Sequence, residues 1–289
     1  YHAIDSEIAD PFKAYAATCY VDREIPHIPV KGEGMPEGLA TLSTTNWKPY
    51  SWSINNVAIA EVMHTALAYW QAGRAEEAYG LMKSVAADNM YLGASPLNFG
   101  QISHYDAARG ECYRDFADPI GVWSRALSEG LFGVRPDLLA KNPVVRLVPG
   151  FPATWDEASV TLPDISYSFR REGRRISYKI NNRYARNAAL ELTVPVSGVE
   201  SVKVNGRPAE WTTAENSIGT PRIVIAAGSA PELDIEIVEA GKFNPAPTGR
   251  ERSEGPVTFR EMTDGNLKYW NAEVRELAPA VGVPENGFG

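Results

Sequence analysis

Between residues 90 and 116 the chain concentrates side chains that can exchange protons or donate hydrogen bonds. They comprise three carboxylates, two arginines, two amides, an imidazole and a phenol: Asn98, Gln101, His104, Tyr105, Asp106, Arg109, Glu111, Arg114 and Asp115. Two carboxyl groups, one acting as an acid and one as a base or nucleophile, are what cleavage of a glycosidic bond requires. The neighbouring arginines can hold a carboxylate ionised or bind an acidic sugar. Since a loop this long inside a compact domain is usually functional, we expect it to carry a site.

A structural interpretation of the same residues stays open. The charged residues from Arg109 to Asp115 can instead form an ion-pair network that fixes a long loop, and such networks also perturb carboxylates. Two further residues are expected to be structural. His64 lies in an apolar helical segment, which favours a hydrogen-bonded core histidine. Glu129 precedes a glycine hinge and is expected to tie the end of a helix to the sheet domain that follows.

Motifs and composition exclude several other classes. Neither the four histidines nor Cys19 and Cys112 have the spacing of a metal site or a disulfide framework, and the chain has no GxGxxG, Walker or GxSxG sequence. We therefore expect no metal and no cofactor. The net charge of −8, without a basic run, argues against binding to nucleic acid or an anionic membrane. No signal peptide and no apolar run of transmembrane length is visible.

Three helices are predicted around the polar loop. Residues 54–70 are apolar nearly all round and predict a buried helix that ends at Gly73. Residues 75–86 have one apolar face, and together the two segments predict an αα-hairpin. Asp118-Pro119 provides an N-cap and a first-turn proline for a third helix that runs to about residue 132. Residues 1–52, with five prolines, are expected to be irregular, with 20–30 extended.

From residue 142 the apolar period changes from helical to two. Eight strands are predicted, at 144–148, 159–162, 165–170, 176–180, 189–194, 199–204, 222–226 and 233–238. Turn signals separate them, and Asn205-Gly206 is the strongest hairpin signal. Short strands at this spacing predict an antiparallel β-sandwich. The Pro- and Gly-rich residues 241–289 are expected to form an extended tail.

Two stretches carry a resemblance to a known architecture. One runs from WKPYSWSINN (47–56) to HTALAYWQAGR (64–74); the other contains RDFAD (114–118), SRALSEGLFGVRPD (124–137), PGFP (149–152) and Trp155. Together they resemble the C-terminal part of six-hairpin glycosidase-like proteins from Bacteroidetes-type polysaccharide degraders. The second stretch also looks like the hinge of sugar phosphorylases and rhamnosidases with an (α/α)6 barrel. The resemblance implies an α+β multidomain chain with part of an α/α toroid in residues 1–140, a sandwich in 141–240 and a tail in 241–289.

The resemblance also implies an activity and a place for it. It implies a glycoside hydrolase of polysaccharides or oligosaccharides, periplasmic or secreted, with its cleft on the loops that lead into the inner helices. We expect Glu111 to be the first catalytic carboxylate, followed by Asp106 and Asp115. The residues expected to bind the carbohydrate are Trp47, Trp52, Asn56, Asn98, His104, Tyr105, Arg109 and Arg114.

Two alternatives and one structural expectation remain. A polysaccharide lyase that acts on a uronate would use an Asn, His, Tyr and Arg set, which Asn98, His104, Tyr105 and Arg109 supply. A non-catalytic sandwich module with a helical adaptor is the other alternative.

A six-hairpin barrel has twelve helices, whereas three are predicted here. We therefore expect the apolar face of residues 54–70 to be exposed and to pair with the missing part of the barrel or with another chain.

Overall fold

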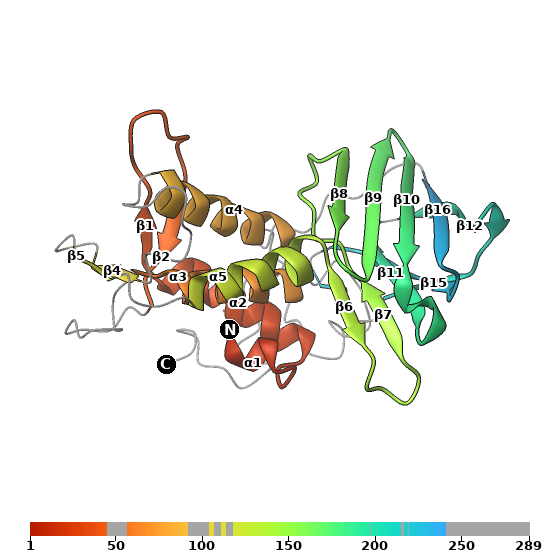
Figure 1. The fold of residues 1–289 in the computed structure, drawn as a ribbon. Helices are drawn as coiled ribbons and strands as arrows, with labels where there is room; N and C mark the ends of the chain where they lie inside the picture. The colour runs from red at the N-terminus through yellow and green to blue at the C-terminus, as the bar shows by residue number, and fades with distance from the viewer. Residues whose placement is uncertain are drawn as a thin grey trace, which may run out of the picture. The chain divides into compact units, whose positions relative to one another are not determined.

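The architecture is taken from a computed structural model, which describes residues 1–44, 57–91, 104–106, 111–113, 118–196, 198–214, 217–218 and 220–240 (Figure 1). The described residues form two compact units, 1–131 and 132–240. The first contains the helices and the second a pair of β-sheets, so the α+β class is confirmed. The predicted boundary between residues 140 and 141 lies after the first sandwich strand, β6 (Val134–Asp137), whereas the compact units divide at residues 131 and 132.

The helical unit consists of five α-helices, two π-helical turns and short strands in its described residues. The helices are α1 (His2–Asp5), α2 (Pro11–Glu24), α3 (Ile59–Gln71), α4 (Ala75–Ala86) and α5 (Asp118–Arg125), and the π-helical turns are η1 (Ala87–Tyr91) and η2 (Ala126–Leu131). The strands are β1 (His27–Pro29), β2 (Ala40–Leu42), β3 (Val57–Ala58), β4 (His104–Asp106) and β5 (Glu111–Tyr113). The three predicted helices are found, and these elements on their own do not show a toroid.

Helix α3 is the centre of this unit. It packs against α1, α2, α4, α5 and η2, and nine of its thirteen residues are buried. Gly73 lies in the short connection between α3 and α4 and stops the first helix, as predicted. Its φ of 82° is a left-handed conformation that glycine adopts without a steric penalty. The expectation of an exposed apolar face is wrong for the described part of this segment. The reason is that α1 and α2, which the sequence patterns did not predict, cover α3 together with α4 and α5.

Helix α2 corrects the expectation that residues 1–52 are irregular. The Asp10 carboxylate caps it by accepting a hydrogen bond from the Lys13 amide at 2.9 Å, and Pro11 occupies the first turn. This is the same Asp-Pro signal that predicted α5. The buried side of α2 consists largely of small residues beside Phe12 and Tyr15, which weakens its apolar periodicity. Residues 20–24 are therefore helical rather than extended.

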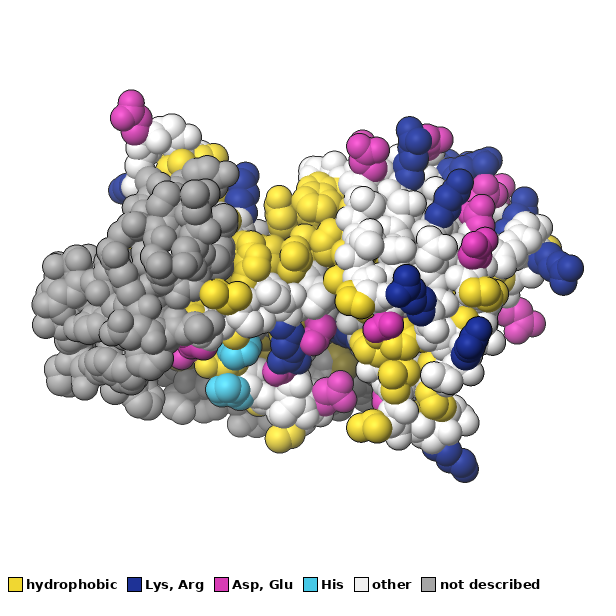
Figure 2. Space-filling model, viewed as in Figure 1, with side chains coloured by type: hydrophobic (Ala, Val, Ile, Leu, Met, Phe, Trp, Pro, Cys, Tyr) yellow, Lys and Arg dark blue, Asp and Glu magenta, His cyan; other side chains and the backbone are white. Residues whose placement is uncertain are grey.

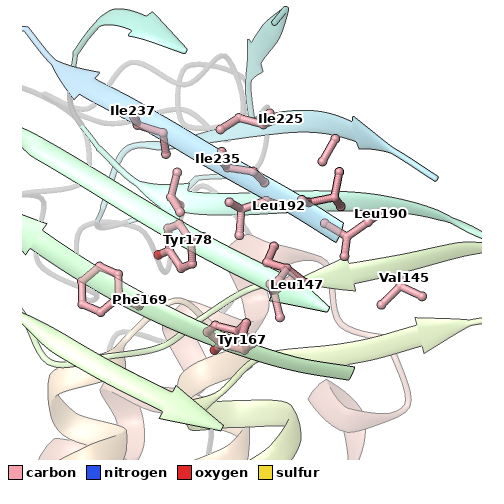
Figure 3. Close-up of a cluster of buried hydrophobic side chains, with 14 of the residues drawn as sticks. Val145, Leu147, Tyr167, Phe169, Tyr178, Leu190, Leu192, Ile225, Ile235 and Ile237 are labelled. Carbon is pink, nitrogen blue, oxygen red and sulfur yellow. The ribbon is translucent and has the colours of Figure 1, made fainter. Parts of the chain in front are cut away.

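The sandwich unit contains all eight predicted strands and three more. Its strands after β6 are β7 (Val144–Leu147), β8 (Glu157–Thr161), β9 (Ile165–Glu172), β10 (Arg175–Asn182), β11 (Ala189–Pro195), β12 (Val199–Val204), β13 (Arg207–Pro208), β14 (Trp211–Thr213), β15 (Arg222–Gly228) and β16 (Glu232–Glu239). One sheet has the order β13-β12-β16-β10-β9-β8 and the other β14-β15-β11-β7-β6. Buried aliphatic and aromatic side chains of both sheets form the core (Figure 3).

The strand pairing refines the predicted antiparallel sandwich. The β12–β13 hairpin turns at Asn205-Gly206, both at positive φ, as the sequence predicts. Strands β7 and β11, however, pair in parallel, Val145 lying opposite Leu190. The chain between them builds β8, β9 and β10 of the other sheet and then returns. Alternation of apolar residues predicts a strand but not the direction of its neighbour, so the parallel pair was not foreseen.

Candidate functional site

A small three-stranded sheet, β3-β4-β5, adjoins the N-terminus of α3 in the helical unit. Strand β3 runs directly into α3, and β4 pairs with it through Val57 opposite Tyr105 and Ala58 opposite His104. Strand β5 pairs with β4 on the other side, and α5 begins five residues after its end. The helix N-termini and the β4–β5 hairpin therefore belong to one region of the helical unit (Figure 1).

The register of this hairpin brings four of the predicted site residues into one sheet. Asp106 lies directly opposite Glu111, Tyr105 opposite Cys112 and His104 opposite Tyr113. The other predicted site residues lie outside the described residues: Trp47, Trp52, Asn56, Asn98, Arg109, Arg114 and Asp115. Of the three predicted catalytic carboxylates, Asp106 and Glu111 are thus opposite each other in the backbone register. The catalytic role of all three, including Asp115, stays a prediction.

Further acidic groups stand at the two helix N-termini. Glu61 is in the first turn of α3 and Asp118 begins α5, where the helix dipole stabilises a negative charge. The pKa of the Tyr1 phenol is raised, first by burial and then by the charges of Glu61 and Asp118. Tyr1 stacks on the His64 ring at a centroid distance of 4.8 Å. His64 is half-buried, and its ring contacts among the described residues are with Tyr1 and His2.

A polar network at the C-terminal end of α3 joins Gln71 to Asp5 and Arg125. The sequence patterns did not predict this network. Arg125 donates from Nη1 and Nη2 to the two carboxylate oxygens of Asp5 at 2.6 and 2.7 Å. Its Nε donates to both oxygens of Glu129 at 3.0 Å. Gln71 Nε2 donates to Asp5 Oδ1 at 2.9 Å. Glu129 thus pairs with Arg125 of its own helical segment, and the expectation that it ties the helix end to the sheet domain stays a prediction.

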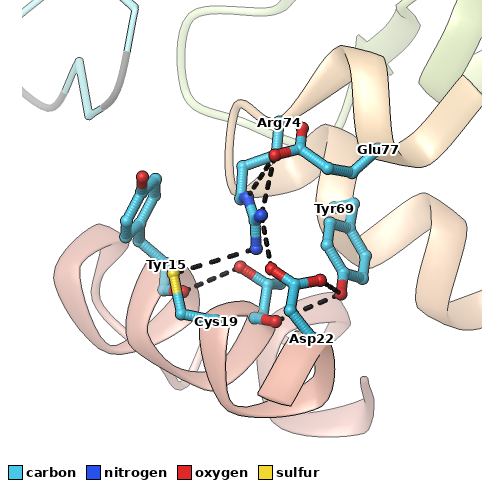
Figure 4. A network of polar contacts seen from close by, with 7 residues as sticks. Tyr15, Cys19, Asp22, Tyr69, Arg74 and Glu77 are labelled. Atoms are coloured by element: carbon cyan, nitrogen blue, oxygen red, sulfur yellow. Dashed lines mark hydrogen bonds and ion pairs between the residues drawn. The ribbon is translucent and has the colours of Figure 1, made fainter. Parts of the chain in front are cut away.

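A second network fastens α2 to the α3–α4 hairpin (Figure 4). Arg74 Nη2 contacts Asp22 Oδ2 at 2.5 Å and Glu77 Oε1 at 2.7 Å, and its guanidinium lies over the Tyr69 ring. The Tyr69 hydroxyl donates to the Asp22 carboxylate. We call these four residues the Arg74 clamp. The only signal for the clamp in the sequence is that Arg74 and Glu77 are three residues apart at the start of a predicted helix, a spacing that favours an ion pair.

Cys19 is a free cysteine among the described residues. Burial raises the pKa of the Cys19 thiol to about 11, which keeps it protonated and unreactive. Within the described ranges, no group of three or more His, Cys, Asp or Glu side chains is placed to hold a metal ion. None of the described helices combines the length and apolar character that crossing a membrane requires.

Comparisons with known proteins leave the family open. No family model matches the sequence, and no curated protein matches it. Among solved structures, the chain is similar to an alpha-L-rhamnosidase from Dictyoglumus thermophilum, with a TM-score of 0.40 and 13% sequence identity. The match covers 63% of this chain and 21% of the rhamnosidase chain. The chain thus spans about a fifth of the length of the solved structure that it matches.

Proposed function

We propose that the chain is part of a glycoside hydrolase whose catalytic carboxylates, Asp106 and Glu111, lie on the β4–β5 hairpin. The observation that carries this proposal is their direct opposition in the hairpin register. Directly opposed residues of an antiparallel pair have Cα atoms about 4.5–5.5 Å apart. This spacing is of the same order as the separation of the two carboxyl groups that act on one glycosidic bond.

The charges of this pair favour a functional role over a structural one. Like charges directly opposite each other destabilise a hairpin, so a purely structural hairpin gains nothing from Asp106 opposite Glu111. Mutual repulsion of two close carboxylates raises the pKa of one of them, which is what a general acid needs near neutral pH. In our proposal Arg109 or Arg114 keeps the other ionised, and Asp115 is the reserve candidate.

The carbohydrate would lie on the loops around the three-stranded sheet. Asn56 directly precedes β3 in the sequence, and His104 and Tyr105 belong to β4, the strand that also carries Asp106. We propose that Trp47 and Trp52 stack on sugar rings and that Asn98, Arg109 and Arg114 bind hydroxyl or acidic groups. The substrate would be met in the periplasm or outside the cell, and the remaining barrel helices would come from a further segment or another chain.

The test is hydrolysis measured with the chain inside the longest reading frame that contains it. A panel of aryl glycosides and plant, algal and microbial polysaccharides is assayed for released aglycone and reducing ends. Glu111→Gln and Asp106→Asn are expected to lower kcat by about 100-fold or more, because general acid–base catalysis contributes about 10²–10⁴. Glu157→Gln, on the exposed edge strand β8, is the matched control and should leave kcat unchanged. Full activity in both site variants would overturn the proposal.

A polysaccharide lyase is the second candidate, favoured by the position of His104 and Tyr105 in β4 beside Asp106. A lyase would remove the α-proton of a uronate and leave an unsaturated product that absorbs in the ultraviolet. Absorbance that rises on an acidic glycan, and falls with Tyr105→Phe, would favour the lyase over the hydrolase. Carbohydrate binding that persists unchanged in Glu111→Gln and Asp115→Asn, with no turnover, would instead indicate a non-catalytic module.

A further inference from the structure

Helix α3 is buried except along one polar stripe. Its partly exposed residues are Glu61, His64, Thr65 and Gln71. At 100° per residue these positions fall on one side of the helix. A polar stripe on an otherwise apolar inner helix has to meet water or polar partners, since an unsatisfied buried polar group is destabilising.

Helix α1 lies over this stripe and is attached to it through polar and ring contacts. None of its residues is buried. The Tyr1 ring, which precedes it, stacks on His64 at 4.8 Å, and Asp5 binds Gln71 and Arg125. In the space-filling view, histidine side chains lie beside basic and acidic ones on the surface of the helical unit (Figure 2). A four-residue helix without buried side chains has little stability of its own, so these contacts hold it in place.

Two features make α1 separable from the rest of the unit. Glu7, between α1 and α2, has a φ of 58°, a left-handed conformation that is unfavourable for a residue other than glycine. The carboxylate of Asp10 caps α2 independently of α1, so α2 does not need α1 in order to begin. The connection from Ser6 to Ala9 can therefore change without disturbing the helix that follows.

The closed arrangement leaves one polar atom of the stripe unsatisfied. Gln71 Oε1 is buried without a hydrogen-bond partner among the described residues, although Gln71 Nε2 is bound to Asp5. Water would satisfy this acceptor if α1 moved away. The closed state is thus held by a few polar contacts and opposed by strain at Glu7 and by this unpaired oxygen.

From this geometry we propose that α1 is a releasable strap over the polar stripe of α3, which opens when the His64 imidazole takes up a proton. The charged and titratable groups around the stripe come from four elements and from Tyr1, which precedes α1. They are Tyr1, His2 and Asp5 from the strap and the residue before it; Glu61 and His64 from α3; and Asp118, Arg125 and Glu129 from α5 and η2. The inference concerns access to the stripe and does not depend on the proposed catalytic pair.

The direction of the pH effect follows from the His64 environment. Burial lowers the pKa of His64 below its ordinary 6.5; the charge of Asp5 opposes this shift, while His2 and Arg125 add to it. Closure is thus fully favoured above pH 6.5 and is lost as the pH falls toward the lower pKa of the closed form. The pKa of Asp5 is lowered, first by its hydrogen bond with Arg125, so its contribution disappears only below about pH 3.8.

Amide hydrogen exchange tests the strap directly. Protection factors, which correct for the intrinsic pH dependence of exchange, are measured from pH 7.5 to 4.5 in the full chain. The amides of Asp5, Ser6 and Ala9, which donate within the strap and its turn, should lose protection several-fold over this range. The Ala14 amide in the first turn of α2 is the internal reference and should not change.

Variants separate the His64 mechanism from general acid destabilisation. His64→Gln should abolish the pH-dependent loss, whereas His27→Gln, at an exposed histidine on β1 of the same unit, should retain it. Asp5→Asn should lower strap protection at every pH while keeping the dependence. The proposal is overturned if strap protection is constant with pH, if it falls equally in His64→Gln, or if Ala14 loses protection in parallel.

Discussion

The sandwich and the helical unit use their charged residues in different ways. In the sandwich, basic and acidic side chains are interspersed over the visible surface, and pairs such as Arg175–Glu236 lie outside an apolar core (Figure 2). In the helical unit, by contrast, Arg74 is only 10% exposed and joins helices far apart in sequence. Among the described residues, the ion pairs of the sandwich lie at its surface except for that of Glu239, which is buried beside Arg171, whereas the helical unit holds Arg74 in its interior between helices. We infer that the apolar pattern carries more of the specification in the sandwich than in the helical unit.

The largest expected effect is in the sandwich core, at Leu192 of β11, which is fully buried. Leu192→Ala removes three carbons from a packed interior and should lower the free energy of unfolding by about 3–5 kcal/mol. Urea unfolding followed by exchange of the β11 and β15 amides measures it. Leu139→Ala, at a fully exposed leucine of the same unit, should change stability by less than about 0.5 kcal/mol. Equal losses would contradict the assignment of the core.

The next effect concerns close packing in the helical core. A Cβ atom at Gly130 of η2 would lie 2.3 Å from Cε3 of the Trp70 ring, which is itself buried. Gly130→Ala should therefore destabilise the helical unit by about 1–3 kcal/mol, the usual range for overpacking. Thermal unfolding followed by tryptophan fluorescence measures it.

A matched glycine sharpens this test. Gly121 of α5 has open space where a Cβ atom would lie, so Gly121→Ala should stabilise the helix by about 0.5–1 kcal/mol. Opposite signs for the two substitutions would show that contact with Trp70, and not helix propensity, decides the outcome at Gly130. The same sign for both would refute that explanation.

The Arg74 clamp tests whether the helical unit depends on its interior charged contacts. Arg74→Met leaves Asp22 and Glu77 without their cation. Removing one partner of a fully buried pair costs about 3–5 kcal/mol, and since Asp22 is 34% and Glu77 46% exposed, we expect about 2 kcal/mol. Urea unfolding of Arg74→Met, Asp22→Asn and the double variant should show a coupling energy of about 1 kcal/mol. Additive losses would mean that the clamp is only a set of independent contacts.

These effects also indicate which features of the fold the sequence can predict. Period-two alternation identified every long strand, because each inward residue faces one continuous core. The predicted antiparallel arrangement is wrong for β7 and β11, which pair in parallel, because strand direction depends on where the chain returns after building the other sheet. Helix α2 was missed because three of its five buried residues, Ala14, Ala16 and Thr18, are small and weaken the apolar period, although Asp10-Pro11 is a start signal in the sequence.

The candidate site divides along similar lines. Asp106 and Glu111 are five residues apart, so a hairpin that turns between them places them opposite each other. Their closeness in the sequence was therefore enough to group them in one candidate site. Asp22 and Arg74 are 52 residues apart, and Asp5 and Arg125 are 120 apart. Contacts at such separations follow from tertiary packing, and neither composition nor periodicity indicates which carboxylate meets which arginine.

The smallest expected effect is on the outside of the sandwich. The Arg175–Glu236 pair joins β10 to β16 at 2.7 Å, but Arg175 is 60% exposed. Because water screens such a pair, Arg175→Gln should lower stability by no more than about 0.5 kcal/mol. In 1 M NaCl, where the screening length is about 3 Å, this loss should vanish, while the loss from Arg74→Met should largely persist because a buried pair is screened less. If salt removed both losses equally, the distinction between a charged surface and a charged interior would fail.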